Sequence, residues 1–160
     1  MALASLLNYL DENNVGYVIL YHSPAYTAQG IAGVTHIPGQ DLAKTVIVLL
    51  DGKLVMAVLP AKHHVDLMLL KKWAKAKTVQ LASEEDFQGR FAGCETGAMP
   101  PFGPLFGVPV YADKSLEQDQ EIAFNAGTHR ELIRMTWKDY KKLVQPTIIN
   151  FAAGHSAEAA

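Results

Sequence analysis

Residues 43–60, AKTVIVLLDGKLVMAVLP, form the most apolar stretch of the chain. Two runs rich in β-branched residues flank Asp51-Gly52, and an Asp-Gly pair is a strong signal for a two-residue type I′ turn. Both runs are apolar almost throughout, which is typical of strands that are covered on both faces. The stretch therefore predicts a β-hairpin at the centre of the fold.

Lys44 is the exception to this pattern, because it places an ammonium group at the start of the first run. A charge in a buried strand must be paired, reach water or serve a function. A lysine at a strand end can also extend its ammonium group to solvent without any function. Taken alone, the residue leaves both interpretations open.

The composition indicates an ordinary soluble domain, with 160 residues of which 49% are hydrophobic and 19% charged. No apolar run approaches the roughly 20 residues of a membrane span, and the N-terminus lacks the basic region of a signal peptide. A single cysteine, Cys94, excludes an internal disulfide and suits a reducing compartment. We expect a cytoplasmic protein in which residues 1–151 form one domain and residues 152–160 a frayed tail.

The charge distribution argues against a dedicated nucleic-acid binder, because the net charge is −2. Two local basic groups nevertheless stand out: Lys62, Lys71, Lys72, Lys75 and Lys77, and then Arg130, Arg134, Lys138, Lys141 and Lys142. Such groups are most often solvated helix faces, and modest phosphate contacts remain open.

The rest of the chain predicts short helices interleaved with short strands. Helices are expected at residues 3–10, 27–34, 62–76, 83–91 and 137–144, and further strands at 17–21, 78–81, 108–111, 121–125 and 131–135. Pro109 favours an edge or a bulge for the strand at 108–111. This order predicts an α+β domain with a mixed sheet or a small barrel.

Residues 93–107 form an irregular loop that contains four glycines and three prolines. Glycine permits close approach of the backbone to a ligand, and proline limits the movement of the loop. Backbone amides that point into a cavity can bind a carbonyl group or an oxyanion. A plain surface crossover is an equal alternative on composition alone, although the loop is long for one.

Three segments together resemble the YbaK-type aminoacyl-tRNA deacylases, which include the editing domain associated with bacterial prolyl-tRNA synthetase. Residues 22–27, HSPAYT, resemble the family's first strand-to-helix crossing, and Lys44 falls where the family keeps its functional lysine. The family's loop of a glycine, three residues and a proline is matched by Gly97, Ala98, Met99, Pro100 and Pro101. The resemblance covers residues 3–151, and residues 125–129 also resemble the second glycine-bearing wall of the family's pocket.

The resemblance implies a mixed β-barrel-like sheet of six to seven strands flanked by helices. It also implies hydrolysis of the ester between a wrong amino acid and its tRNA, in which substrate ribose hydroxyls assist the attacking water. Neither a metal nor a cofactor is implied. Lys44 would anchor or polarise the substrate near its carbonyl group, and the loop at 97–101 would cradle the aminoacyl group. The other implied substrate-binding residues are His22 and, on the opposite wall, Asn125, Gly127, Thr128 and His129.

The implied partners are a mischarged aminoacyl-tRNA, bound transiently, and a synthetase or another carrier that brings the tRNA. Two other functions stay open: a non-catalytic module that binds aminoacyl-tRNA or an amino acid, and hydrolysis of another small activated ester. The sequence does not indicate which amino acid is removed, because such pockets differ in the side chains that line them.

Other candidate chemistry is weaker. Cys94 has no basic partner near it in the sequence, and a lone cysteine is usually a small buried residue. His63 and His64, expected side by side on a helix, point about 100° apart and cannot chelate one metal ion. Gly30 and Gly33 do not continue into a phosphate-binding motif, so no nucleotide cofactor is expected.

Overall fold

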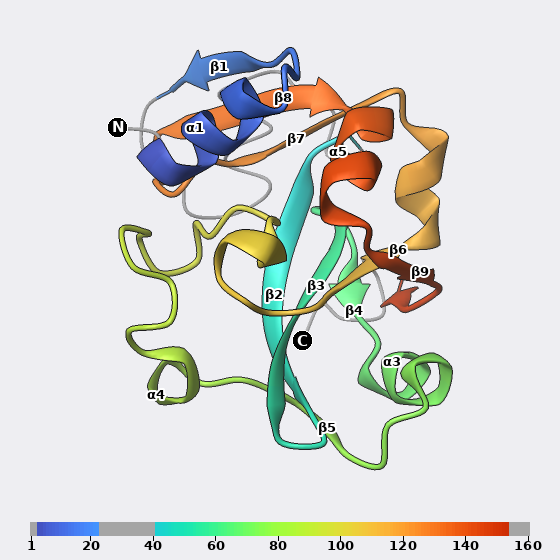
Figure 1. Cartoon of the computed structure of the whole chain (residues 1–160). Helices are drawn as coiled ribbons and strands as arrows, with labels where there is room; N and C mark the ends of the chain where they lie inside the picture. Colours follow the sequence, from blue (N-terminus) through green and yellow to red (C-terminus); the bar gives the residue numbers. More distant parts are fainter. Residues whose placement is uncertain (1–2, 23–40, 154–160) are drawn as a thin grey trace.

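The computed structural model describes residues 3–22 and 41–153, which form a mixed α+β fold (Figure 1). The helices are α1 (Ala4–Glu12), α3 (Leu67–Ala74), α4 (Glu84–Phe87) and α5 (Trp137–Val144). The strands are β1 (Val18–Tyr21), β2 (Ala43–Leu50), β3 (Lys53–Pro60), β4 (His64–Val65), β5 (Val79–Leu81), β6 (Val110–Asp113), β7 (Glu121–Asn125), β8 (Glu131–Thr136), β9 (Thr147–Ile149) and β10 (Ala152–Ala153). No helix of this described part is long and apolar enough to cross a membrane.

The central hairpin is confirmed. β2 and β3 pair antiparallel over their whole length, and Asp51 and Gly52 have φ angles of 51° and 80°, as a type I′ turn requires. Side chains alternate between two core clusters: Ile47 packs into the larger cluster, and Val48 packs into a second cluster on the other face. The hairpin is therefore covered on both faces.

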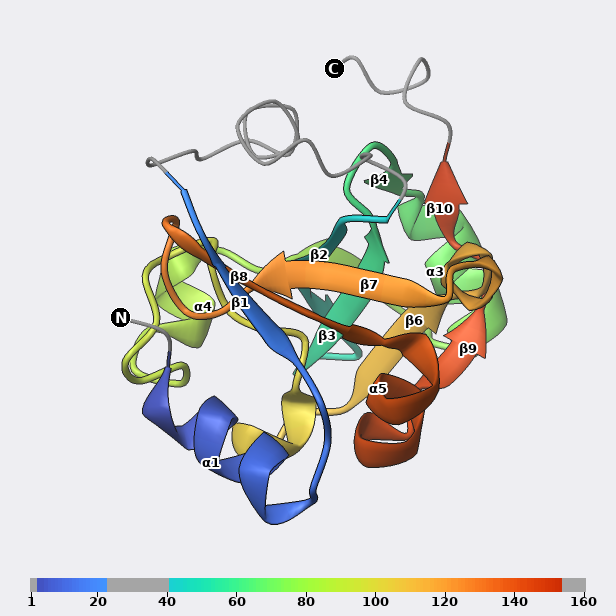
Figure 2. The same ribbon diagram turned by 90° about the horizontal axis from the view of Figure 1, so that it is seen from above.

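The strands form three sheets in the described residues. The largest has the order β5-β2-β3-β6-β9, the next β1-β8-β7, and β10 pairs with β4. One isolated parallel bridge, between Leu42 and Ala123, joins β7 to the start of β2, and Figure 2 shows β7 and β8 crossing over the β2–β3 hairpin there. The mixed α+β class is confirmed, and closure of the strands into a barrel stays a prediction.

The helix expected at 62–76 is shorter, because α3 begins only at Leu67. The Asp66 side chain caps it by accepting hydrogen bonds from the backbone N–H groups of Met68 and Leu69, at 3.0 and 3.1 Å. His64 instead lies in β4, which pairs with β10. The expectation that His63 and His64 share a helix was therefore wrong.

Two further boundaries differ from the sequence prediction. α4 ends at Phe87 instead of residue 91, although its capping box between Ser83 and Asp86 is present. β6 lies between β3 and β9 and is not an edge strand. Pro109 precedes β6, and its carbonyl oxygen accepts a hydrogen bond of 2.9 Å from the Met56 N–H, so the ladder loses no donor inside the strand.

The C-terminal end is ordered beyond the expected limit of residue 151. β9 and β10 were not predicted, and Ala152 and Ala153 pair with β4 instead of fraying. The buried carboxylate of Asp113 holds this segment, because it accepts hydrogen bonds of 2.8 Å from the N–H groups of both Phe151 and Ala152. The helix expected at 27–34 lies outside the described residues.

Candidate functional site

The Leu42–Ala123 bridge lies close in sequence to both Lys44 and Asn125. Lys44 is the second residue of β2 and Asn125 the last of β7, and each lies two residues beyond the bridge in parallel strands. Because side chains alternate along a strand, both lie on the face that Leu42 and Ala123 share. Lys44, which interrupts an apolar strand, and Asn125, which the family resemblance implied, thus follow one bridge on one face.

Asn125 carries a buried side-chain oxygen, Oδ1, that has no hydrogen-bond partner among the described residues. Leaving a buried amide oxygen unsatisfied costs about 1–3 kcal/mol, so such atoms are uncommon in folded proteins. Asn125 thus offers a buried acceptor on the face that Leu42 and Ala123 share.

His22 reaches the same face from β1. Its backbone N–H donates a 2.9 Å hydrogen bond to the Arg130 carbonyl, which extends the pairing of β1 with β8 by one residue. By alternation His22 shares a face with Leu20, which packs against an apolar cluster that contains Leu42, Ala123 and Leu132. This small cluster forms a floor, and His22, Lys44 and Asn125 lie around it.

The loop at 97–101 and the turn at 126–129 are bound directly to each other. The Gly127 N–H donates to the Ala98 carbonyl at 2.9 Å, and the Glu95 N–H donates to the Gly127 carbonyl at 2.8 Å. These hydrogen bonds join the loop to the turn, and the expectation that the two line opposite walls of a pocket stays a prediction. The loop and the turn form one continuous wall, called here the loop–turn wall, which adjoins Asn125.

His129 is fixed in this wall at both its backbone and its ring. Its N–H donates to Glu95 Oε1 at 2.7 Å, and its Nε2 lies 2.8 Å from the Thr96 carbonyl oxygen. A carbonyl oxygen only accepts, so Nε2 carries the proton in this hydrogen bond. Thr128 has a structural part in the turn, because its Oγ1 accepts a hydrogen bond of 3.2 Å from the Arg130 N–H.

Two glycines give the wall its shape. Gly97 and Gly127 have φ angles of +85° and +99°, a left-handed backbone that other residues adopt only with strain. A Cβ atom on Gly97 would lie 3.5 Å from His129 Cε1, and one on Gly127 would lie 3.1 Å from the Cβ of Leu3. The shape of the wall therefore depends on two left-handed glycines, and at Gly127 also on the close approach of Leu3.

The loop is anchored in the core from Ala98 onward, where its side chains are buried. The fully buried Tyr140 hydroxyl donates a 2.7 Å hydrogen bond to the Pro101 carbonyl, and burial raises the pKa of Tyr140 well above its ordinary value. Met99 joins the larger core cluster with Ala43 and Ile47, on the opposite face of β2 from Lys44. The loop thus packs on the face of β2 opposite Lys44, and Asn125 directly precedes the turn of the loop–turn wall.

Glu95, Thr96 and Tyr140 were missed by sequence reasoning. Each acts through a contact with a distant part of the chain, and only Tyr140 had a local signal, as an apolar position of α5.

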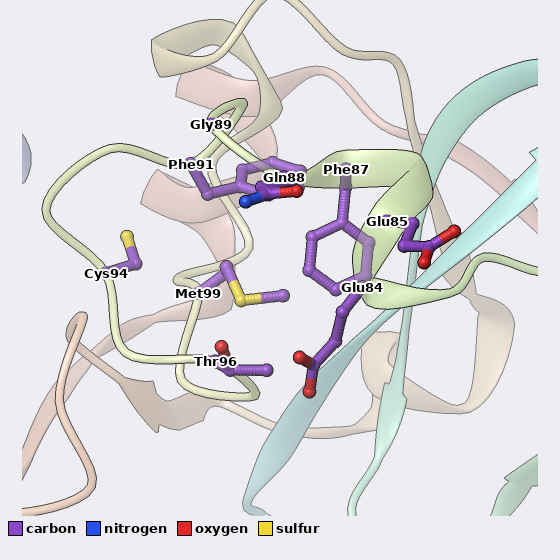
Figure 3. A pocket seen from close by; sticks show the side chains of 9 residues that line it. All are labelled: Glu84, Glu85, Phe87, Gln88, Gly89, Phe91, Cys94, Thr96 and Met99. Carbon is purple, nitrogen blue, oxygen red and sulfur yellow. The ribbon is translucent and has the colours of Figure 1, made fainter.

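A pocket of about 370 Å³ lies on the outer side of the loop (Figure 3). Thr96 and Met99 face Glu84 and Phe87 of α4 across it. Cys94 also lines it, and burial raises the pKa of the Cys94 thiol to about 11, so the thiolate needed by a nucleophile is disfavoured. Neither Lys44 nor Asn125 lines this pocket.

Comparison with known proteins shows the family to which the chain belongs. The family model described as "Aminoacyl-tRNA editing domain" matches residues 22–143, and the chain belongs to this family. It is 26% identical over 151 residues to the multifunctional Ser/Thr-tRNA deacylase ProXp-y of Escherichia coli (strain K12), covering 91% of this chain and 90% of that relative. It is 25% identical over 151 residues to the prolyl-tRNA editing protein ProX of Acetoanaerobium sticklandii, covering 90% and 91% of the two chains.

A solved structure of a candidate trans-editing enzyme for prolyl-tRNA synthetase has the same fold. Its TM-score is 0.77 at 21% sequence identity, and the match covers 93% of this chain and 95% of that chain.

Proposed function

We propose that this protein hydrolyses the ester bond of mischarged aminoacyl-tRNA in trans, with Lys44 as the group that polarises the ester. The observation that carries the proposal is the placement of Lys44 and Asn125 on one face, beside the loop–turn wall. Family membership and the two deacylase and editing relatives support the same reaction.

In this reaction water attacks the ester carbonyl carbon, and the bond from that carbon to the ribose oxygen breaks. The ribose oxygen leaves with a proton, and the products are the free amino acid and uncharged tRNA. The ester is already activated, so the protein must mainly position it and stabilise the negative charge that develops on the carbonyl oxygen. The Lys44 ammonium group is suited to that charge.

Asn125 and the loop–turn wall are proposed to hold the aminoacyl group. The unsatisfied Asn125 Oδ1 is an acceptor for a donor such as the substrate's α-amino group. Gly97 and His129 would contact the rest of that group. Ala98 and Gly127, whose backbone N–H and C=O groups are already bound within the wall, would keep the wall in shape around it. We place His22, Met99, Pro100, Pro101 and Thr128 in supporting positions around it.

Several finer points belong to the same proposal. Residues 1–151 would act as one editing domain, and its strands would approach a barrel. A synthetase that hands over the tRNA is the proposed protein partner, and the cytoplasm is the proposed compartment because aminoacyl-tRNA is used there in translation.

The test is deacylation of a panel of tRNAs that carry alanine, cysteine, serine or threonine on prolyl and other acceptors. Wild type is compared with Lys44→Ala and with Lys142→Ala, an exposed lysine of α5 that serves as the matched control. We expect wild type and the control to remove at least one amino acid, and Lys44→Ala to be at least about 100-fold slower.

Each other outcome has a definite meaning. If wild type removes no amino acid faster than spontaneous hydrolysis, the chain is a binding module and the proposal fails. If Lys44→Ala is as fast as wild type, the protein is a deacylase, but Lys44 does not polarise the ester.

A further inference from the structure

The second unusual surface lies at the far end of β2, around α3. Lys71, Lys72, Lys75 and Lys77 lie in or just after this helix. Among the described residues, no carboxylate lies within ion-pair distance of any of the four. The other basic group differs, because Lys141 pairs with Glu117 at 3.2 Å and Arg134 with Glu121 at 3.8 Å.

The two acids nearest to these lysines are occupied by backbone donors. Asp66 caps α3, as described above. Asp51 accepts hydrogen bonds from the backbone N–H groups of Lys77 and Thr78, at 2.8 and 2.9 Å. The hydrogen bonds from Thr78 and Lys77 hold the pKa of Asp51 below its ordinary value. Both carboxylates therefore bind backbone N–H groups, and neither forms an ion pair with one of the four lysines. The ammonium groups of the lysines stay available to solvent or a ligand.

Trp73 lies within this basic group and is 49% exposed. The ammonium group of Lys72 lies 5.0 Å from the centre of its ring. A large aromatic side chain left at the surface among lysines is a contact that bases and ribose can stack on.

A groove of about 570 Å³ continues the basic surface from the end of α3 to the tip of the central hairpin. Ala74 and Ala76 line one side, and the charged side chains of the lining are Lys53, Arg90 and the backbone-bound Asp51, which leave a net positive charge. Arg90 is held in place, because its Nε and Nη2 donate to the carbonyl groups of Phe106 and Gly107 at 3.1 and 3.2 Å. A guanidinium fixed in this way binds phosphate at a lower entropic cost.

The position of α3 fits a tRNA whose ester lies at Lys44. Figure 1 shows α3 beside β5, and β5 pairs with residues 48–50 of β2. Leu50 lies six residues after Lys44 in β2, which corresponds to a length of about 20 Å. Val46 and Val48 share the face of Lys44 and pack with α3 residues such as Leu70, so α3 covers the same face of the hairpin. The single-stranded 3′ end of a tRNA spans such a distance before its acceptor helix begins.

We infer that this surface, formed by the four lysines with Trp73, Lys53 and Arg90, binds the phosphate backbone of the tRNA acceptor stem. The inference rests on the proposed function for its choice of RNA. Charge complementarity selects the partner, since an RNA backbone is the most densely charged anion that the proposed reaction brings to the protein. Backbone contact of this kind positions the RNA and reads no sequence.

The test uses the full chain with Lys71, Lys72 and Lys75 changed together to Gln. The control changes Lys138, Lys141 and Lys142 of α5 to Gln, which removes the same charge from another helix. Binding of uncharged tRNA and of an acceptor-stem RNA hairpin is measured by fluorescence anisotropy over a range of salt concentrations. Deacylation kinetics are measured in parallel.

We expect the α3 variant to bind both RNAs about tenfold or more weakly and to lower the slope of log affinity against log salt by about two to three. KM for aminoacyl-tRNA should rise while kcat stays near wild type, and the α5 variant should behave as wild type. RNA binding by the α3 variant equal to that of wild type would overturn the inference. The inference would also be overturned if the α3 variant bound RNA as wild type does and lost only the stimulation of its deacylation by an added synthetase. The surface would then bind a protein and not RNA.

The two proposals can fail separately. If wild type binds RNA through α3 but hydrolyses no ester, the surface is retained and the deacylase proposal is lost. If wild type hydrolyses the ester while the α3 variant keeps its affinity and salt dependence, only the surface is wrong.

Discussion

The two ends of β2 differ in the burial and hydrogen bonding of the polar side chains around them. At the Lys44 end, Asn125 adjoins the tightly packed loop–turn wall, in which His129 is held, backbone groups are paired and side chains are mostly buried. At the Leu50 end, the lysines around α3 are largely exposed and lie among acids that are already bound to backbone. Buried, fixed groups suit the stabilisation of charge in a reaction, and exposed, flexible charges suit the capture of a polyanion.

This difference predicts how substitutions at the two ends separate activity from stability. Changes in the packed loop–turn wall should alter both turnover and folding, since they disturb buried contacts, whereas a change at the unsatisfied Asn125 should alter turnover alone. Changes at the α3 end should alter binding alone, because exposed charges contribute little to stability.

Asn125→Ala should have the largest effect among the supporting residues. We expect kcat/KM for the edited aminoacyl-tRNA to fall about 10- to 100-fold, as when one positioned polar group is removed from an active site. The folded state should lose no stability, because the buried Oδ1 makes no hydrogen bond to a described residue. Asn150→Ala, at an exposed position, is the control, and both variants are compared by kinetics and by urea unfolding. A loss of stability without a loss of activity would assign Asn125 a structural part instead.

Gly127→Ala tests the packing of the loop–turn wall. The left-handed φ costs an alanine about 1–2 kcal/mol, and the new Cβ would also press against Leu3 at 3.1 Å. Gly89→Ala is the matched control, since Gly89 has a φ of +78° with nothing within 4 Å of its Cβ position. Urea unfolding should show a larger loss of stability for Gly127→Ala than for Gly89→Ala, and deacylation should fall only in the first. Equal losses of stability in the two variants would mean that packing against Leu3 does not contribute to stability.

The substitution Asp119→Asn has the smallest expected effect, which is a change in the pH dependence of the free energy of unfolding. Burial, and then the nearby carboxylate of Asp41, raise the pKa of Asp119 to about 6, while Lys62 acts in the opposite direction. Between about pH 4 and 6 the native state thus binds more protons than the unfolded state, so this group's contribution falls as pH rises through that window. Asp119→Asn removes the penalty and should stabilise the protein at pH 7 by about 1 kcal/mol, after allowance for solvent screening of a half-buried group.

The measurement for Asp119 is urea unfolding of both proteins from pH 4 to 7. Their stabilities should be closest near pH 4 and should diverge up to pH 6.5, while Glu85→Gln, at an exposed position, should follow wild type. Parallel profiles for wild type and Asp119→Asn would show that the carboxyl group is not perturbed.

The features that the sequence predicted well are those with local signals. The Asp51-Gly52 turn, the Thr136 cap of α5 and the hairpin of β7 and β8 are each encoded within a few neighbouring residues. Lys44 stood out because a charge interrupts an apolar strand, and its position beside Asn125 followed only from a bridge between distant strands.

The errors arose where contacts are distant in sequence. His64 and Val65 pair with β10, so α3 begins only at Leu67. No pattern in the neighbouring sequence predicts this pairing. Glu95 and Thr96 resemble ordinary loop residues until the turn at His129 is brought against them. The loop and the turn were therefore both predicted as parts of a site, but the hydrogen bonds that join them into one wall were not.

The most direct test of the account is single-turnover deacylation, with enzyme in increasing excess over a mischarged tRNA that wild type edits. Lys44→Ala and the α3 variant with Lys71, Lys72 and Lys75 changed to Gln are compared with wild type. The account predicts that the α3 variant reaches the wild-type rate at saturating enzyme, whereas Lys44→Ala stays at least about 100-fold slower however much enzyme is added. A Lys44→Ala enzyme that reaches the wild-type rate at saturation would contradict it, because Lys44 would then serve binding alone.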